Sequence, residues 1–426
     1  MKIAIVIGKN WNSPHIGGGF SYMLTLIGAL SQSNAKHEFV FLVPEGEEAP
    51  KLLNPKQVIF YPTEPQIKEI PFRFIDKLLN KLSLFSFLIK ETQKLYVKNK
   101  EEELLRQAYE RIKECVEKII NEHSIDLIYY PQALQHNIDV NAPYFTTFWD
   151  LGHVQHSYFP EVSANGIFES RESFYKNILP KASTIVVESE EGKKNLQHYY
   201  RIPEHKIIVV HQFPSDVINC QVSDEKQEEF LKSCGLSAGK YFFYPAQFWA
   251  HKNHYGILQA LFLLKKNYNI LAKVAFTGSD KGNMVYIKKQ ALELGLQEQV
   301  YFLGFVETEE LYILYKNAIA LLMPTFLGPT NMPIVEALYL SCPIICSDME
   351  GHREMAKDAA LYIHPTNYEQ IANQMRLLIN HPELREDLKN KSKIVAKGTK
   401  FSLDNAVSTL EKAFDDFEKI RRCWGN

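Results

Sequence analysis

The sequence predicts an α/β protein built from two doubly wound parallel sheets, each covered by helices, that face each other across a cleft. Short apolar segments alternate with helical segments along the whole chain, which is typical of parallel strands covered on both faces. The length of 426 residues exceeds one ordinary core and suits two domains of roughly 200 residues each. A polar stretch at 214–229 interrupts the alternation and is the best candidate for a linker.

The first domain is expected at residues 1–218. A helix is predicted at 20–31, and long helices at 66–122 form an expected insertion. Short apolar runs predict strands at 2–8, 39–43, 58–61, 127–130, 144–148, 184–187 and 207–210.

The second domain is expected at residues 219–404, followed by a final helix within 405–426. Ligands of such sheets bind beyond the carboxyl ends of the strands, which between two such domains is the cleft. Strands are predicted at 241–244, 272–277, 300–302, 318–323 and 343–347.

Composition excludes several classes of protein. A net charge of −2 gives no basic excess for nucleic acid, and no run of 18 apolar residues indicates a membrane span. The first eight residues are too short and too β-branched for a signal peptide, so a cytoplasmic location is expected. The six cysteines are scattered and expected to be reduced core residues, and their spacing predicts no metal site.

The segment 324–338 is the most informative part of the sequence, because a polar loop there joins a buried strand to a helix opened by Pro333. Free backbone N–H groups and the helix dipole at such a junction favour phosphate. Glu336, three residues inside the helix, is placed to reach a sugar hydroxyl beside the phosphates. The pattern predicts a nucleotide-sugar site, with loop residues Gly328, Pro329, Thr330 and Asn331.

Lys252 precedes a helix predicted to begin near residue 253. A cation at a helix N-terminus opposes the dipole, which suggests that an anion such as a diphosphate lies between them. A solvated lysine is the alternative. Gly278 and the segment 303–306, which includes Val306, follow other strands and could wall a base pocket with backbone groups, although plain turns are as probable.

Two loops of the first domain also carry candidates. Gly17, Gly18 and Gly19 let the backbone approach a ligand closely, although a flexible turn explains them equally well. Asp150 and His153 follow the strand at 144–148. A histidine there can bond a sugar hydroxyl, and a carboxylate can position it or act as a base. A metal site with His156 and Glu161 is conceivable but generic in spacing, and a loop capping its own backbone is the remaining alternative.

Residues 72–100 combine an apolar stripe at helical spacing with an excess of lysine and arginine. A cationic amphipathic helix can lie on an anionic membrane. The same stripe could instead face the core.

The run from Gly328 to Ala337, continued by 341–345, resembles glycosyltransferase family 4, the retaining group 1 transferases with two Rossmann-like domains (GT-B architecture). Most of that family has two glutamates eight positions apart here. Glu336 matches the second, which would bind the donor ribose, whereas Gly328 stands at the first. The Gly-Pro-Thr-Asn loop and the segment 248–254 resemble a branch often found among bacterial O-antigen and capsule transferases.

The resemblance implies that Thr330 and Asn331 face the donor diphosphate and that Lys252 binds phosphate. Gln247 stands where the family usually has arginine, so the loop amides would carry more of the phosphate binding. Trp149 stands where many relatives have histidine, and His153 is taken as the sugar-contacting histidine. The loop with Gly17, Gly18 and Gly19 matches the family's glycine-rich loop near the phosphates and the acceptor, and residues 405–426 would pack back on the first domain.

The implied activity is retaining transfer of a hexose-type sugar from a UDP- or GDP-sugar to a hydroxyl acceptor, without a metal or other cofactor. The residues expected in catalysis are His153, Asp150 and Lys252. The expected acceptor is a lipid-linked glycan in surface polysaccharide synthesis, reached from the cytoplasm at the inner membrane face. Alternatives are a soluble metabolite or protein acceptor, or a non-catalytic protein that binds nucleotide sugars.

Overall fold

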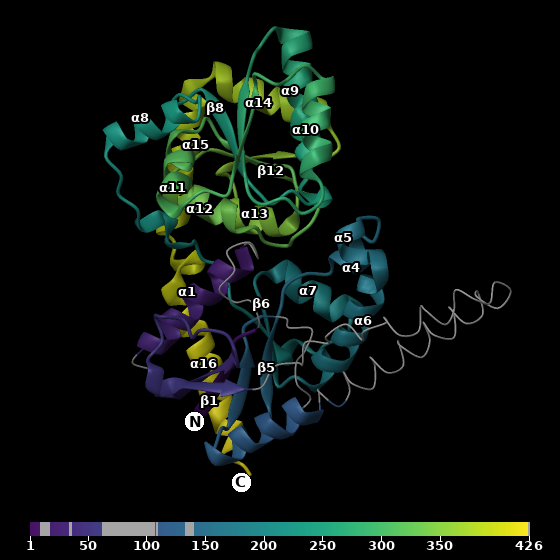
Figure 1. The fold of residues 1–426 in the computed structure, drawn as a ribbon, viewed down its shortest axis with the longest axis vertical. Helices are drawn as coiled ribbons and strands as arrows, with labels where there is room; N and C mark the ends of the chain where they lie inside the picture. The colour runs from purple at the N-terminus through teal and green to yellow at the C-terminus, as the bar shows by residue number, and fades with distance from the viewer. Residues whose placement is uncertain (9–17, 34–35, 62–106, 108–109, 133–139, 425–426) are drawn as a thin grey trace, which may run out of the picture.

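The computed structural model describes residues 1–8, 18–33, 36–61, 107, 110–132 and 140–424. They form two α/β domains stacked end to end, with the first domain below and the second above in Figure 1. The predicted fold class is therefore confirmed. The cationic segment 72–100 lies outside the described residues, and of the expected helical insertion the structure shows a helix at 110–122.

The first domain holds a seven-stranded sheet in the order β3-β2-β1-β4-β5-β6-β7, in which every pairing is parallel. Its strands are short and mostly buried, as expected when helices cover both faces. The strands are β1 Lys2–Val6, β2 Glu38–Pro44, β3 Val58–Tyr61, β4 Leu127–Tyr130, β5 Tyr144–Phe148, β6 Thr184–Val187 and β7 Ile207–Val209.

The second domain holds a six-stranded parallel sheet in the order β10-β9-β8-β11-β12-β13. The edge strand β13 was not predicted from the sequence. The strands are β8 Tyr241–Pro245, β9 Lys273–Thr277, β10 Val300–Gly304, β11 Leu321–Met323, β12 Ile344–Ser347 and β13 Ala360–Ile363.

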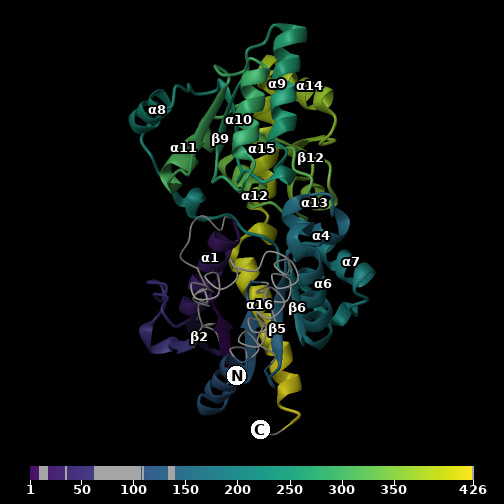
Figure 2. The ribbon, with the colours of Figure 1, turned by 45° about the vertical axis from the view of Figure 1, so that its right-hand side comes forward.

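Helices flank both sheets (Figure 2). Those of the first domain are α1 Gly18–Gln32, α4 Gly152–Gln155, α5 Pro160–Ser163, α6 Ile167–Ile178 and α7 Glu190–Tyr199. Those of the second are α8 Asp224–Ser233, α9 His254–Tyr268, α10 Met284–Glu293, α11 Thr308–Asn317, α12 Met332–Leu340, α13 Glu350–Ala356, α14 Tyr368–Asn380 and α15 Pro382–Lys397, and α16 Leu403–Arg421 follows. Short 3₁₀ turns lie at η2 Pro55–Gln57, η4 Ala164–Gly166, η5 Leu179–Lys181, η6 Glu204–Lys206, η7 Asp216–Asn219, η8 Ala250–Lys252 and η9 Thr399–Phe401.

The chain crosses between the domains twice. It leaves the first core after Phe213 and enters the second at Val217. It returns after Phe401, and α16 then runs along the first domain (Figure 2), where Leu410 and Phe414 are fully buried in its core. The two domains are thus joined by two separate segments of the chain.

Glu354 on α13 ties the second domain to the first. Its carboxylate accepts hydrogen bonds from the backbone N–H of Glu190 at 3.0 Å and from Lys400 at 3.0 Å, and it pairs with His211 at 2.9 Å. Burial alone would raise the pKa of Glu354, but the bonds from His211 and Lys400 hold it at about 2. The carboxylate therefore remains charged at neutral pH.

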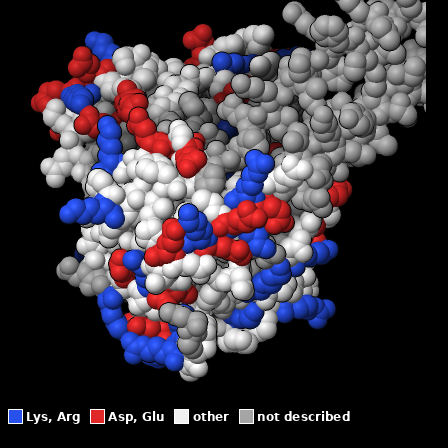
Figure 3. Space-filling model, turned by 60° about the horizontal axis from the view of Figure 1, so that its bottom comes forward, with Lys and Arg blue, Asp and Glu red and all other residues white. Residues whose placement is uncertain are grey.

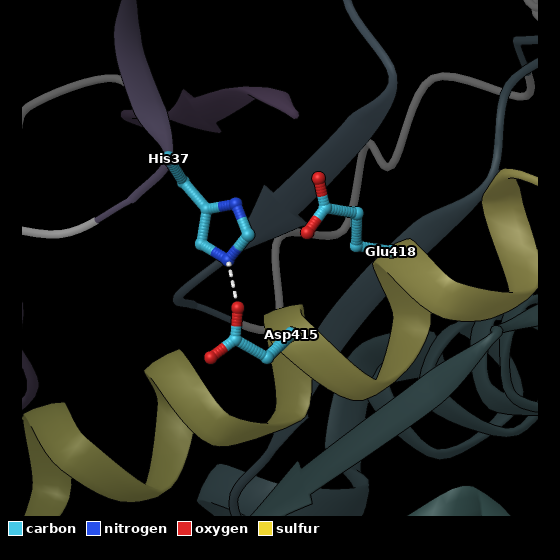
Figure 4. Close-up of side chains that lie close together, drawn as sticks. All are labelled: His37, Asp415 and Glu418. Atoms are coloured by element: carbon cyan, nitrogen blue, oxygen red, sulfur yellow. Dashed lines mark ion pairs between the residues drawn. The ribbon is translucent and has the colours of Figure 1, made fainter.

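An ionic cluster fastens α16 to the start of the chain (Figure 4). His37 lies 3.3 Å from Asp415, and the two residues place ligand-type atoms within 4.8 Å of those of Glu418. Cations of the chain already neutralise these carboxylates: Lys36 pairs with both, and the Met1 ammonium lies 3.5 Å from Glu418. The cluster therefore consists of ion pairs that hold α16 against the N-terminal part of the chain.

Replacing Phe414 should test how strongly α16 supports the first domain. Its ring stacks on Phe145 at 5.4 Å and meets Phe39 and Tyr129 edge-on. We expect Phe414→Ala to destabilise the domain by about 3–5 kcal/mol in urea unfolding, because a buried aromatic ring is lost. Ile420→Ala on the same helix is the control, since Ile420 is 58% exposed. Equal effects of both changes would contradict this role of α16.

Candidate active site

A cavity of about 700 Å³ lies between the two domains, at the carboxyl ends of both sheets. Most of the residues predicted at the site line this interdomain cavity. Those residues are Gly19, Asp150, Gln247, Lys252, Gly278, Val306, Gly328, Pro329, Thr330, Asn331 and Glu336. Gly18 begins α1, and Gly17 lies outside the described residues.

The loop between β11 and α12 forms one wall of the cavity. The helix begins at Met332, with Pro333 in its first turn as predicted. Gly328 has a φ of +111°, and an added Cβ would lie 3.1 Å from the Thr330 carbonyl oxygen. A side chain at this position would therefore be strained, so the loop offers backbone groups there.

Lys252 reaches this loop from the end of the 3₁₀ turn before α9. Its ammonium group donates a hydrogen bond of 2.9 Å to Asn331 Oδ1. The next residue, Asn253, caps α9 through Gly256 N–H and donates to the Pro324 carbonyl, which fixes the turn against the loop. Burial lowers the pKa of Lys252 to about 8, although the charge of Asp150 raises it.

A buried histidine orients Asn331. His352 Nδ1 lies 2.9 Å from the Ser347 carbonyl oxygen, so that nitrogen carries the proton and donates. Burial lowers the pKa of His352 to about 4, so the ring is neutral and its Nε2 accepts from Asn331 Nδ2 at 2.9 Å. Asn331 Oδ1 must then face Lys252. Sequence reasoning missed His352, although its place after β12, at a strand's carboxyl end, was a usable signal.

The close approach of α13 makes this arrangement possible. A Cβ on Gly351 would lie 1.6 Å from the Pro329 carbonyl oxygen, so the loop packs directly on the helix. Glycine is required there because any side chain would push the loop away. The ring of His352, the next residue, consequently lies beneath the loop and is fully buried.

Glu336 lies one turn into α12 and is 4% exposed. Its carboxylate accepts hydrogen bonds from the hydroxyls of Ser215 and, at 2.7 Å, Tyr315. Burial raises the pKa of Glu336, while these two bonds lower it. The side chain lines the cavity beside the loop, where the sequence placed a ribose-binding carboxylate.

Two further second-domain residues predicted at the site, Gly278 and Gln247, also line the cavity. Gly278 has a φ of +122°, and a Cβ there would lie 2.6 Å from the Ala246 carbonyl oxygen. Gln247 accepts from the Trp249 indole N–H at 3.1 Å and donates to Ser279 at 3.2 Å. It is thus a neutral hydrogen-bonding residue that supplies no positive charge.

Asp150 brings a charged carboxylate to the first-domain wall. Its Oδ1 accepts from Arg171 at 2.8 Å and from the Gly152 N–H at 2.7 Å. Burial alone would raise the pKa of Asp150, but Arg171 and Gly152 outweigh it and hold the pKa below its usual value. Both bonds fall on one oxygen, and the group is ionised at neutral pH.

His153 does not reach the cavity, contrary to the sequence interpretation. Its ring is fully buried in the first domain, packs against Phe168 and Tyr175, and pairs with Glu172 at 3.1 Å. The reason is that α4 begins at Gly152, which turns the next residue toward α6. A direct contact between His153 and substrate is therefore not supported.

The remaining polar residues of that loop do not form the metal site considered from spacing. Glu161 instead accepts from the backbone N–H of His251 at 2.8 Å and pairs with its Nδ1 at 2.7 Å, which links the domains at one end of the cavity. His156 lies 2.8 Å from the hydroxyl of Tyr158.

Glu188, which sequence reasoning missed, lines the cavity directly after β6. It accepts a hydrogen bond from the Thr330 hydroxyl and so spans the two domains. Burial raises the pKa of Glu188 to about 7, with the Thr330 bond opposing and the charge of Asp150 adding to the shift. Its position at a strand's carboxyl end was the available signal.

Residues 226–395 match the family model described as Glycosyl transferases group 1. An uncharacterized glycosyltransferase of Methanocaldococcus jannaschii is 23% identical over 65% of this chain and 71% of its own length. The O-antigen chain mannosyltransferase RfbU of Salmonella typhimurium is 26% identical over 45% of this chain, and the chain spans about half (49%) of RfbU.

The fold is also found among solved structures. Anabaena HepE in complex with UDP-glucose superposes with a TM-score of 0.68 at 15% identity, covering 98% of this chain and 100% of HepE. Both sheets and both domains are included in that coverage. Residues 226–395 therefore resemble the group 1 glycosyltransferases, and the chain as a whole has the two-domain GT-B fold.

Proposed function

We propose that the protein transfers a hexose-type sugar, with retention of configuration, from a nucleoside diphosphate sugar to a hydroxyl acceptor. The observation that carries the proposal is the contact of Lys252 with Asn331 at the N-terminus of α12, with Glu336 one turn away. A cation and a helix N-terminus that meet in one cavity suit a diphosphate. The buried carboxylate of Glu336 suits the adjoining ribose hydroxyls.

The proposed chemistry needs little from protein side chains beyond charge stabilisation. The bond from the sugar anomeric carbon to the diphosphate oxygen breaks, and a bond to the acceptor oxygen forms on the same face. The acceptor proton passes to the departing phosphate. Lys252 and the amides of 328–331 would stabilise the charge on the leaving group. Metal-free catalysis stays a prediction, which activity in the presence of EDTA would support.

Two features favour a second candidate, a protein that binds nucleotide sugars without turnover. Gln247 supplies no charge, and Gly328 supplies no carboxylate. Release of nucleoside diphosphate from a nucleotide sugar would distinguish the two. The wild-type protein should raise its melting temperature with UDP-glucose or GDP-mannose and release the diphosphate. Binding without release would favour the second candidate, and no binding of either donor would contradict both.

Two substitutions should separate binding from turnover. We expect Glu336→Ala to weaken donor binding by roughly tenfold, because a buried hydrogen-bonding group is lost. Lys252→Ala should lower kcat by about 10²-fold, since its charge acts on the leaving group. Titration calorimetry and released-diphosphate assays measure these effects. The exposed Lys240→Ala and Glu228→Ala are matched controls, and full activity in both site variants would refute the assignment.

The acceptor is proposed to be a lipid-linked glycan in surface polysaccharide synthesis, which the similarity to RfbU supports. A soluble metabolite or a protein remains the alternative. No helix within the described ranges combines the length and the apolar character needed to cross a bilayer. On the face seen in Figure 3, the described residues carry both signs of charge side by side. The proposed peripheral membrane contact is assigned to 72–100.

Liposome binding tests this contact. Replacing the lysines and arginine of 73–100 by glutamine should abolish sedimentation with phosphatidylglycerol liposomes, because the electrostatic attraction to anionic lipid is lost. Phosphatidylcholine liposomes serve as the uncharged control. Unaltered binding by the substituted protein would exclude this segment as the membrane contact.

A further inference from the structure

Three neighbouring strands of the first sheet end at the cavity wall with an oxygen-bearing side chain. Asp150 follows β5, Glu188 follows β6 and Gln212 follows β7, and all three residues line the cavity. Since β6 pairs in parallel with both β5 and β7, these ends lie side by side. The first domain therefore presents a row of hydrogen-bond acceptors to the cavity.

Two members of this row are buried without a complete set of partners. Glu188 is 5% exposed and Gln212 is 6% exposed. Glu188 Oε1 and Gln212 Oε1 have no hydrogen-bond partner among the described residues. Such atoms are rare in folded proteins and commonly meet a ligand or water. Asp150, in contrast, already accepts from Arg171 and Gly152.

The position of Glu188 relates it to the loop of the second domain. Its other oxygen, Oε2, accepts from Thr330, two residues from Gly328. Gly328 cannot hold a side chain without strain, and the carboxylate of Glu188 in the first domain contacts the loop two residues further on. A sugar attached to a diphosphate on the loop would extend toward this wall.

The side chains of Asp150, Glu188 and Gln212 are better suited to bind hydroxyl groups than phosphate. A carboxylate oxygen repels phosphate but accepts strongly from O–H donors. A carboxamide can donate to or accept from a hydroxyl, whichever way its amide group is turned. Trp149 lines the same wall and offers an apolar ring surface to the C–H groups of a sugar. The set suits a carbohydrate better than a second phosphate.

We propose that Glu188 and Gln212 form a subsite that binds sugar hydroxyls in the interdomain cavity. The proposal rests on the function proposed above. The sugar is either the one carried by the donor or the acceptor glycan, since both present the same hydroxyl chemistry. In either case the subsite belongs to the first domain and acts on the sugar, while the second domain binds the nucleotide.

Paired titrations test the subsite. The affinities of the wild-type protein for UDP and GDP are compared with those for UDP-glucose and GDP-mannose. If the subsite binds the donor sugar, Glu188→Gln and Gln212→Ala should reduce the affinity for the preferred nucleotide sugar by about tenfold and change that for its diphosphate by less than about threefold, because base, ribose and diphosphate contacts remain. Glu190→Gln, exposed and two residues away, is the matched control.

Thr330→Val separates sugar binding from the domain contact. This change removes the hydrogen bond to Glu188 but leaves its carboxylate. It should therefore lower the affinities for nucleoside diphosphate and nucleotide sugar by the same factor, so that the ratio of the two affinities is unchanged. If Glu188→Gln behaved in this way, Glu188 would only hold the loop, and the subsite would be wrong.

A further arm distinguishes the source of the sugar. If the subsite binds the donor sugar, Glu188→Gln and Gln212→Ala should lose the preference for nucleotide sugar over nucleoside diphosphate in titrations without any acceptor. Acceptor binding predicts unchanged donor affinities and an approximately tenfold higher KM for a p-nitrophenyl glycoside acceptor. Changes below twofold in both quantities would overturn the proposal. If the wild-type protein bound none of the four nucleotides, the proposed function would fail first, and the subsite with it.

Discussion

The side chain of Asn331 lies between a hydrogen-bond donor, Lys252, and a hydrogen-bond acceptor, His352. The arrangement of the cavity wall depends on Asn331 bonding to both. Lys252 can only donate, and the neutral His352 can only accept at the nitrogen that faces Asn331. The Ser347 carbonyl oxygen decides which nitrogen of His352 is protonated. A backbone carbonyl below the loop thereby sets the direction in which the ammonium group of Lys252 is held.

This chain of bonds explains why several small residues are required around it. Gly351 lets α13 touch the loop, and Gly328 lets the loop turn with a positive φ. Gly256 leaves room for the side chain of Asn253, which fixes the turn that carries Lys252. The loop and the turn that position Lys252 are thus fixed by close packing before any ligand arrives. Such preorganisation lowers the cost of ordering the site when a ligand binds.

The two domains contribute different chemistry to the cavity. The second brings a cation, a helix N-terminus and the buried Glu336, which suit a nucleotide. The first brings Asp150, Glu188 and Gln212, all of them rich in acceptor oxygens. Because Thr330 and Glu188 bond across the gap, the loop between β11 and α12 is in contact with the wall that we assign to the sugar. Bond cleavage would occur where these two surfaces meet.

The sequence was sufficient for the elements whose signals are local. Apolar runs predicted twelve of the thirteen strands of the two sheets, and the strand–loop–helix pattern at 318–338 predicted a loop that the structure places in the cavity wall. It could not show that His153 turns into the core, because this follows from where α4 begins. Glu188, Gln212 and His352 were missed for a related reason: the role of each residue depends on a partner or a cavity formed by distant parts of the chain.

Trace acetylation of Lys252 tests the central claim, that this lysine is held desolvated where a diphosphate binds. A lysine with a pKa of about 8 has roughly two hundredfold more neutral amine at pH 7.5 than an ordinary lysine. A bound diphosphate should raise the pKa again and shield the amine. We predict that limiting acetic anhydride labels Lys252 ahead of the exposed Lys240, and that saturating UDP or GDP suppresses this labelling. Labelling no faster than at Lys240, or unchanged by both nucleotides, would contradict the account.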